Sequence, residues 1–290
     1  MAAYSLVDMP RSVADAVRNA ARAEAAGLHR YMVAQVERAD CVAVLAVVAD
    51  RVPRIELATA VMAIQSTLPQ YVAQQARTLN QISDGRFTLG LGVSHEPIAV
   101  GVLGLEWDRP YRHMVEYLDA VLPLLADQRV DVDGSKVSHH TEIDVPGPAP
   151  RVMLAAMGPM MLALARDRTE GTVLAFTGPR TIESHVRPII GEDAMVSAAV
   201  GVCVTADIED ARSRIREELA IYPALPSYQA MVEREGIADM MDLVAVGHPD
   251  DVRAELARYA AAGADEIGIE ILGTPEETER AWRMIEEGLD

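Results

Sequence analysis

Short apolar runs alternate along the chain with segments in which apolar residues recur every three or four positions. The clearest example lies between residues 55 and 92. The apolar run 55–62 predicts a buried strand, Pro69 opens a helical pattern that Gly85 ends, and 87–92 predicts the next buried strand. This part of the chain therefore predicts one unit of strand, helix and parallel strand.

The same alternation continues to the end of the chain and predicts eight strands, each followed by helical sequence. Strands are expected at 4–7, 30–36, 55–62, 87–92, 152–155, 172–176, 196–204 and 266–271. Helices are expected after the caps Ser12 and Asp40, after Pro69, and at 96–103, 111–125, 159–168, 179–190, 208–245, 250–262 and 275–288. Right-handed crossovers between so many parallel strands favour an α/β fold, a (β/α)8 TIM barrel; an open doubly wound sheet is the alternative.

One polar segment interrupts this repeat. Residues 130–145 contain an Asp133-Gly134 turn and predict a small hairpin insertion outside the repeating core. Prolines mark its exit, and we interpret it as an excursion within a single domain that spans residues 1–290. We also expect an ion pair between Arg86 and Glu116 near the barrel.

Composition restricts the partners and the location of the protein. The chain has 44 acidic and 26 basic residues and a net charge of −18, which argues against nucleic acid or an anionic membrane as a general partner. Cys41 and Cys203 form no paired motif, and we expect both to be buried thiols of a cytoplasmic protein. No signal peptide and no membrane-spanning run is predicted.

Two strand ends carry sequence that suits an anion. In a (β/α)8 barrel the active site lies at the carboxyl ends of the strands, and a Gly-Pro turn follows the predicted strands at 152–155 and 172–176. Backbone amides at the helix starts could hold a phosphate there, although each turn alone could be an ordinary connection. The candidate residues are Ala156, Met157, Gly158, Pro159 and Met160, and Thr177, Gly178, Pro179 and Arg180.

Ser94 and His95 follow the predicted strand 87–92 and are the candidates for chemistry on a substrate. A histidine at a strand end could donate a proton or a hydrogen bond, and the alternative is a surface loop histidine. The pair His139 and His140 lies in the polar hairpin and is expected to be solvated. No His and carboxylate spacing typical of a metal site occurs, so we predict no metal.

Several sequence blocks resemble the luciferase-like monooxygenase family of flavin and deazaflavin enzymes. The blocks are the strand, Pro69, helix and GRFTLGLG of residues 55–92, SHEP at 94–97, GLEWDRP and HMVEYL within 104–118, LAAMGPMMLALA at 154–165, EGTVLAFTGPRTI at 170–182, VGHPDDV, and GADEIGIEI near the end. They are similar to the branch that uses coenzyme F420, and the resemblance covers most of the chain.

The resemblance implies a cofactor, a reaction and a partner. It implies an F420-dependent oxidoreductase that transfers hydride between the deazaflavin C5 and a small organic substrate, and a homodimer. The nearest alternative is a monooxygenase of the same fold that uses reduced FMN, and an alternative of another class is a barrel that binds a flavin without turnover.

The resemblance also assigns roles to residues. It places a non-prolyl cis peptide at Ala60-Val61, in a bulge with Met62 that supports the flavin ring. Some deazaflavin dehydrogenases of the family carry a catalytic histidine at the end of the second strand, where this chain has Gln35. We expect Gln35, Ser94 and His95 to face the substrate, and the missing histidine favours reduction of a C=N or C=C bond.

Overall fold

Within residues 2–289, which the computed structural model describes, eight parallel strands form a closed barrel. They are β1 (Ala3–Asp8), β2 (Arg30–Val33), β3 (Glu56–Thr59), β5 (Phe87–Gly92), β8 (Arg151–Ala155), β9 (Gly171–Ala175), β10 (Met195–Val204) and β12 (Glu266–Ile271). Each strand pairs with the next one in the chain, and β12 pairs with β1 to close the ring. The predicted (β/α)8 barrel is confirmed, and the open sheet is wrong.

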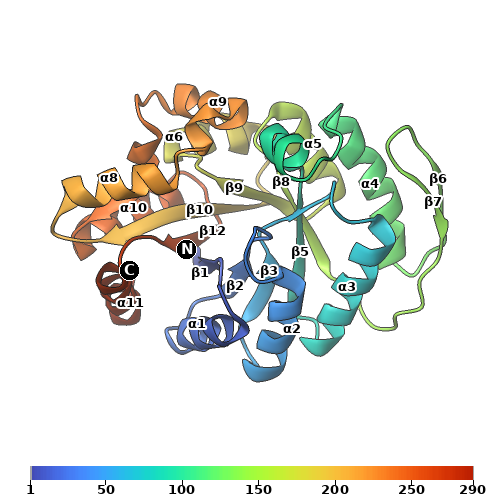
Figure 1. Ribbon diagram of the computed structural model, residues 1–290, viewed down its shortest axis with the longest axis horizontal. Coiled ribbons are helices and arrows are strands. Elements are labelled where there is room, and N and C mark those ends of the chain that lie inside the picture. The colour runs from blue at the N-terminus through green and yellow to red at the C-terminus, as the bar shows by residue number, and fades with distance from the viewer. Residues whose placement is uncertain (1, 290) are drawn as a thin grey trace.

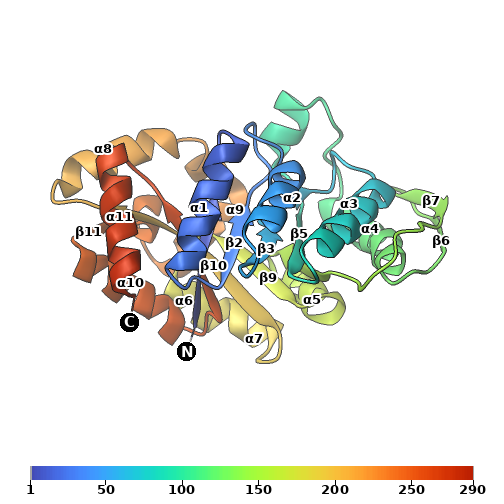
Figure 2. The ribbon, with the colours of Figure 1, turned by 90° about the horizontal axis from the view of Figure 1, so that it is seen from below.

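Helices surround this barrel (Figure 1). They are α1 (Val13–Ala25), α2 (Cys41–Arg51), α3 (Pro69–Ile82), α4 (Pro110–Leu125), α5 (Pro159–Arg168), α6 (Pro179–Thr181), α7 (Arg187–Ile190), α8 (Ile208–Glu218), α9 (Pro226–Glu235), α10 (Pro249–Ala261) and α11 (Pro275–Glu287). Figure 2 shows α11, α1, α2 and α3 side by side along the outside. None of the described helices is long and apolar enough to cross a membrane.

The first two helices begin at the predicted caps. The Ser12 hydroxyl accepts a hydrogen bond from the Asp15 N–H at 3.1 Å, and the Asp40 carboxylate accepts one from the Ala43 N–H at 2.8 Å. These contacts satisfy amides that have no partner within a helix. The buried faces of the helices then pack on the outward side chains of the strands and form the main core.

Two segments differ from the sequence-based expectation. The strand predicted at 55–62 stops at Thr59, and a separate short strand, β4 (Met62–Ala63), follows it. The region 208–245 is not one helical stretch: it holds α8, η3 (Tyr222–Ala224), α9 and η4 (Met240–Leu243), and β11 (Ala245–Gly247) then pairs with the end of β10. Its apolar side chains form a second core, which also packs against Met157 and Phe176 beyond β8 and β9.

Further helical turns complete the connections. The short helix expected at 96–103 is a π-helical turn, η1 (Pro97–Val102), and a second one, η2 (Ile182–Val186), joins α6 to α7. The helix predicted at 179–190 is therefore continuous but contains a wider turn in its middle. A π-helical turn inserts one extra residue between hydrogen-bonded partners, a feature that apolar spacing does not report.

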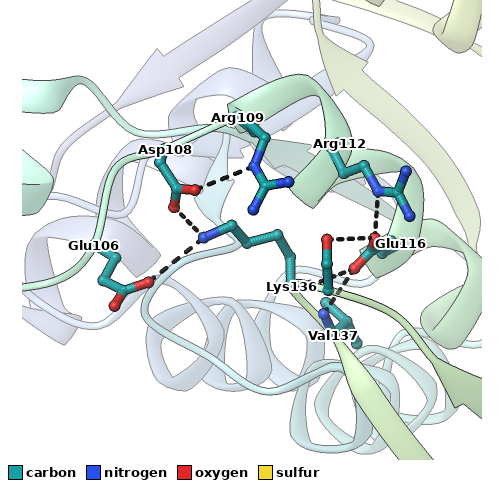
Figure 3. Close-up of polar contacts among 8 residues, drawn as sticks. Glu106, Asp108, Arg109, Arg112, Glu116, Lys136 and Val137 are labelled. Carbon is teal, nitrogen blue, oxygen red and sulfur yellow. Dashed lines mark hydrogen bonds and ion pairs between the residues drawn. The ribbon is translucent and has the colours of Figure 1, made fainter.

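The hairpin insertion is confirmed as β6 (Val130–Asp133) paired with β7 (Ser138–Thr141), and it lies outside α4 at one edge of the molecule (Figure 1). Glu116 on α4 holds it, because its carboxylate accepts hydrogen bonds from the Arg112 side chain and from the backbone N–H groups of Lys136 and Val137 (Figure 3). The expected Arg86–Glu116 pair is wrong. Arg86 donates instead to backbone oxygens in α2 and just before β3.

The interior of the barrel is polar near its amino-terminal end. Side-chain contacts there link the last strand, β12, to the first two strands, β1 and β2. Arg30 on β2 donates to Glu266 on β12 across an Nη1–Oε2 distance of 2.6 Å, and both side chains are almost fully buried. The Ser5 hydroxyl on β1 donates to the other carboxylate oxygen of Glu266. Buried charges are unfavourable unless they are paired and hydrogen-bonded, so these contacts favour one register of β1, β2 and β12.

We predict that Glu266→Gln lowers the free energy of unfolding by about 3–5 kcal/mol, because the buried Arg30 charge would lose its partner. Urea unfolding followed by circular dichroism measures the change. Glu56→Gln is the matched control, since Glu56 pairs with Arg151 in a partly exposed bridge, and exposed pairs contribute at most about 1 kcal/mol. Equal losses in the two variants would contradict the importance of the interior pair.

Candidate active site

The carboxyl-terminal end of the barrel is open to solvent on its inner side. Successive side chains of a strand alternate between the interior and the helix layer. On β9 and β10 the inward Ala175 and Ala199 are partly exposed, whereas the outward Leu174 and Ala198 are buried in the main core. Small side chains at the inward positions therefore leave accessible space in the mouth of the barrel.

A bulge after β3 borders this mouth. The Ala60-Val61 peptide bond is cis, as expected from the family resemblance. Two glycines of β5 make room for it: a Cβ on Gly90 would lie 2.0 Å from the Thr59 carbonyl oxygen, and one on Gly92 would lie 2.7 Å from Val61 Cγ2. The sequence GLG in β5 thus has a steric cause, because any larger residue at either position would collide with the bulge.

The three residues that the resemblance assigns to support of the flavin ring lie in different environments. Ala60 packs against the cluster of side chains inside the barrel, and Val61 lies over Gly92. Both are partly exposed. Met62 is buried, and its side chain belongs to the main core behind the barrel wall. Only Ala60 and Val61 therefore border the mouth with their side chains.

Gln35 holds the bulge and the start of a helix. Its backbone N–H donates to the Val61 carbonyl oxygen at 3.4 Å, and its side-chain oxygen accepts from the Cys41 N–H, the first residue of α2, at 3.0 Å. The amide oxygen that was expected to face the substrate is engaged in this helix start. Gln35 accordingly holds the start of α2 in this structure, and its expected contact with the substrate stays a prediction.

The turn between β8 and α5 is open at its outer side. Ala156 is buried, and both of its backbone groups bond the Thr172 hydroxyl on β9. Gly158 is exposed, and a Cβ there would meet nothing within 4 Å. Pro159 begins α5, whose first amides have no side-chain cap. An uncapped helix start attracts anions, so this turn fits a phosphate.

Two methionines flank this turn. The backbone oxygen of Met157 accepts a hydrogen bond from Nε2 of His185 at 3.0 Å, which also defines the tautomer of that histidine. Met160 is exposed at the start of α5. The turn is thus anchored on the barrel side and accessible from solvent, as a binding turn requires.

The second predicted phosphate-binding segment is occupied by a carboxylate of the protein itself. Glu235 on α9 accepts hydrogen bonds from the backbone N–H groups of Arg180 at 3.1 Å and Thr181 at 2.8 Å, and from the Thr181 hydroxyl at 2.7 Å. A Cβ on Gly178 would lie 2.3 Å from the carboxyl carbon of Glu235. The segment with Thr177 therefore attracts an anion, as predicted, but the anion present is Glu235.

His95 lies where the chain leaves β5, and it is partly buried beside Tyr228 of α9. The centroids of the two rings are 5.4 Å apart. Burial lowers the pKa of His95 below its usual value, so the imidazole is neutral at pH 7 and offers one donor nitrogen. The N–H of the neighbouring Ser94 donates to the Gln65 side-chain oxygen at 3.1 Å.

Four rings form what we call the aromatic wall: His95, Phe176, Tyr222 and Tyr228. The centroid of Phe176 lies 4.8 Å from that of Tyr222 and 5.4 Å from that of Tyr228, and the two tyrosines are 5.5 Å apart. Sequence analysis missed both tyrosines, because they fall in the region 208–245 that was treated as plain helix. The available signal was their scarcity, since only 4% of the chain is aromatic.

No group of three or more His, Cys, Asp or Glu side chains among residues 2–289 is arranged to hold a metal ion. The histidines of the hairpin lie on β7, where His140 contacts Asp131 and Asp133 of β6 at the surface. The accessible mouth of the barrel is consequently bordered by small residues, backbone amides and the aromatic wall.

Comparison with known proteins assigns the family. The model of the luciferase-like monooxygenase family matches residues 3–266. The chain belongs to this family. The resemblance that the sequence blocks indicated is therefore confirmed.

Two relatives carry names that concern the cofactor. The chain is 28% identical over 233 residues to a Mycobacterium tuberculosis protein whose name assigns it provisionally to the coenzyme F420-dependent oxidoreductases, and this match covers 70% of the chain and 66% of that protein, just under two thirds. It is 26% identical over 277 residues to a 5,10-methylenetetrahydromethanopterin reductase of Methanolobus tindarius, covering 81% and 82%.

A solved structure supports the same architecture for this luciferase-like protein. The coenzyme F420-dependent tetrahydromethanopterin reductase of Methanopyrus kandleri superposes with a TM-score of 0.82 and 18% identity, covering 99% of this chain and 97% of that one. At this identity the likeness shows the fold, and the residues of the mouth must carry any argument about chemistry.

Proposed function

We propose that the protein is an oxidoreductase that uses coenzyme F420 and transfers hydride between the deazaflavin C5 and a small organic substrate. The observation that carries the proposal is the small-residue mouth, bordered by the Ala60-Val61 bulge that Gly90 and Gly92 accommodate, at the end of the barrel where such folds act. The names of the two relatives support the choice of coenzyme.

The residues of the mouth fit such a coenzyme. Ala60 and Val61 would support the ring system, and the open turn at Gly158 and Pro159 would hold a phosphate with its backbone amides. A bound deazaflavin supplies hydride at C5. The protein supplies position, because the small inward side chains leave room for a planar group and the aromatic wall limits its approach from one side.

Ser94 and His95 are the proposed substrate contacts at the end of β5. A neutral imidazole beside Tyr228 donates a hydrogen bond without carrying charge. We propose reduction of a C=N or C=C bond, because hydride placement is the main requirement of such reactions, and because Gln35 offers no basic side chain at the end of the second strand.

Separate fluorescence titrations of the purified protein with coenzyme F420 and with FMN test the proposed function. Micromolar or tighter binding of F420, with weaker binding of FMN, supports it. A preference for FMN would favour the monooxygenase alternative, and binding of neither would favour a barrel without turnover.

We predict that Gly158→Val weakens F420 binding about 10- to 100-fold, since hydrogen bonds to a charged group contribute about 1.5–3 kcal/mol and the added side chain would cover the amides of α5. The fold should tolerate the change, because the space around Gly158 is open. Gly101→Val is the matched control, as a Cβ at Gly101 also meets nothing within 4 Å. Wild-type affinity of Gly158→Val would place the phosphate elsewhere.

We predict that His95→Ala lowers kcat at least ~100-fold, the usual effect of losing one hydrogen-bond donor to reacting atoms, and leaves F420 affinity nearly unchanged. Because the pKa of His95 is lowered, the loss should persist from pH 7 to pH 8. Steady-state kinetics and the F420 titration measure both quantities. His140→Ala in the exposed hairpin is the control, and unchanged turnover of His95→Ala would remove His95 from the mechanism.

A further inference from the structure

Glu270 lies near the carboxyl end of β12 and faces the inside of the barrel. The side chains of β12 alternate, and Glu266 points inward to Arg30. A Cβ on Gly268 would lie 2.7 Å from Val7 Cγ2 and 2.9 Å from Met32 Cε, both of which belong to the interior cluster. Glu270 is two residues further on and hence shares this face, at the level of the mouth.

No side chain or amide among residues 2–289 forms a hydrogen bond or ion pair with the Glu270 carboxyl. Its neighbours across the two strand pairings are Val7 on β1 and Gly201 on β10, neither of which offers a polar side chain. The partly exposed Glu270 differs in this from the buried acids Glu116 and Glu235, each of which accepts several hydrogen bonds. A carboxyl without partners inside the barrel is available to a ligand.

The charged and titratable groups around Glu270 come from five elements. Burial first, then the negative charge of Glu218 on α8, raises its pKa from the usual 4.5 to about 7; Asp8 acts in the same direction and Arg38 opposes them. After burial, the Glu270 charge also contributes to raising the pKa of Tyr222 and Tyr228. The Glu270 charge thus acts on both tyrosines of the aromatic wall, and with a pKa of about 7 about half of the carboxyl groups keep their proton at pH 7.

We propose that Glu270 is a further catalytic residue, which binds the nitrogen of an imine substrate and donates the proton that this nitrogen receives during reduction. The inference rests on the proposed function. Hydride from the coenzyme forms the new C–H bond, the electron pair of the C=N bond moves to nitrogen, and the Glu270 O–H proton forms the N–H bond. The carboxylate that remains takes up a proton from water.

The surroundings favour a nitrogen over a carbon at this end of the substrate. An imine nitrogen accepts a hydrogen bond from the protonated Glu270 carboxyl, and the positive charge that it gains with the proton is attracted by the carboxylate and by the faces of aromatic rings. An apolar C=C group in the same place would bury the Glu270 carboxyl without a partner, which is unfavourable. Phe176 packs against Tyr222 and Tyr228, the two tyrosines whose pKa values the Glu270 charge helps to raise.

Glu270→Gln tests the environment of the carboxyl without any coenzyme. The raised pKa means that ionisation destabilises the folded protein as the pH rises from about 4.5 to about 7. The variant should therefore raise Tm by at least about 2 °C at pH 8 and leave it nearly unchanged at pH 5. Glu192→Gln, which changes an exposed acid in the loop before β10, is the control. Equal Tm values of wild type and Glu270→Gln at pH 8 would overturn a desolvated, unpaired Glu270.

Turnover tests the catalytic role, with 1-pyrroline as the imine and 2-cyclopenten-1-one as its carbon counterpart. With reduced coenzyme F420 supplied, the wild type should reduce 1-pyrroline at a rate that falls above about pH 7, and Glu270→Gln should lower kcat at least ~100-fold and lose this pH dependence. Glu192→Gln should keep the wild-type kcat. Wild-type turnover of Glu270→Gln, or failure of the wild type to prefer 1-pyrroline, would overturn the inference.

The F420 titration separates this inference from the proposed function. Glu270→Gln should bind F420 as the wild type does, because Glu270 is assigned to the substrate. If the wild type does not bind F420, the proposed function fails, while the Tm comparison still reports on Glu270. If both proteins bind F420 and turn over 1-pyrroline equally, only the inference fails.

Discussion

Closure of the barrel between its last and first strands is the constraint on which the mouth depends. Glu266 contacts Arg30 and Ser5 inside the ring, so β12 cannot shift by one residue against β1 without removing a buried charge from its partner. Because side chains alternate along a strand, fixing Glu266 inward also fixes Gly268 and Glu270 inward. The polar contacts at one end of the barrel thereby determine which groups line the other end.

The sequence was sufficient for the order of strands and helices, because each unit repeats the same two periodicities. The position of the bulge at Ala60-Val61 was also predicted, but from the resemblance to the family and not from the conformational preferences of the residues. Contacts between distant segments were not accessible in this way. Nothing in the spacing indicates that Gln35 meets Cys41, that Glu235 meets Thr181, or that Arg86 and Glu116 lie apart. The Glu235 contact depends on how the region 208–245 packs against the barrel, and the other pairings depend on the packing of helices and loops around it.

For Glu270, the sequence predicts which face of the strand the side chain occupies but not which residues surround it. Glu270 stands in the segment GADEIGIEI, and alternation alone puts it on the face of Glu266. What the sequence lacked was the identity of the neighbours, Val7 and Gly201, which leave the carboxyl without a partner. An acid in a strand predicts either a buried pair or a free carboxyl, and β12 contains one example of each.

The contact between Glu235 and the start of α6 has a consequence for ligand selection. The starts of α5 and α6, which follow the neighbouring strands β8 and β9, could together have bound a ligand with two anionic groups. The start of α6, however, already binds the carboxylate of Glu235. Because Glu235 belongs to the same chain, its carboxylate acts at an effective concentration of about millimolar or more. A free anion would have to displace this carboxylate to bind there. If the proposed function holds, the barrel binds one anionic group at α5 and discriminates against ligands that need both helix starts.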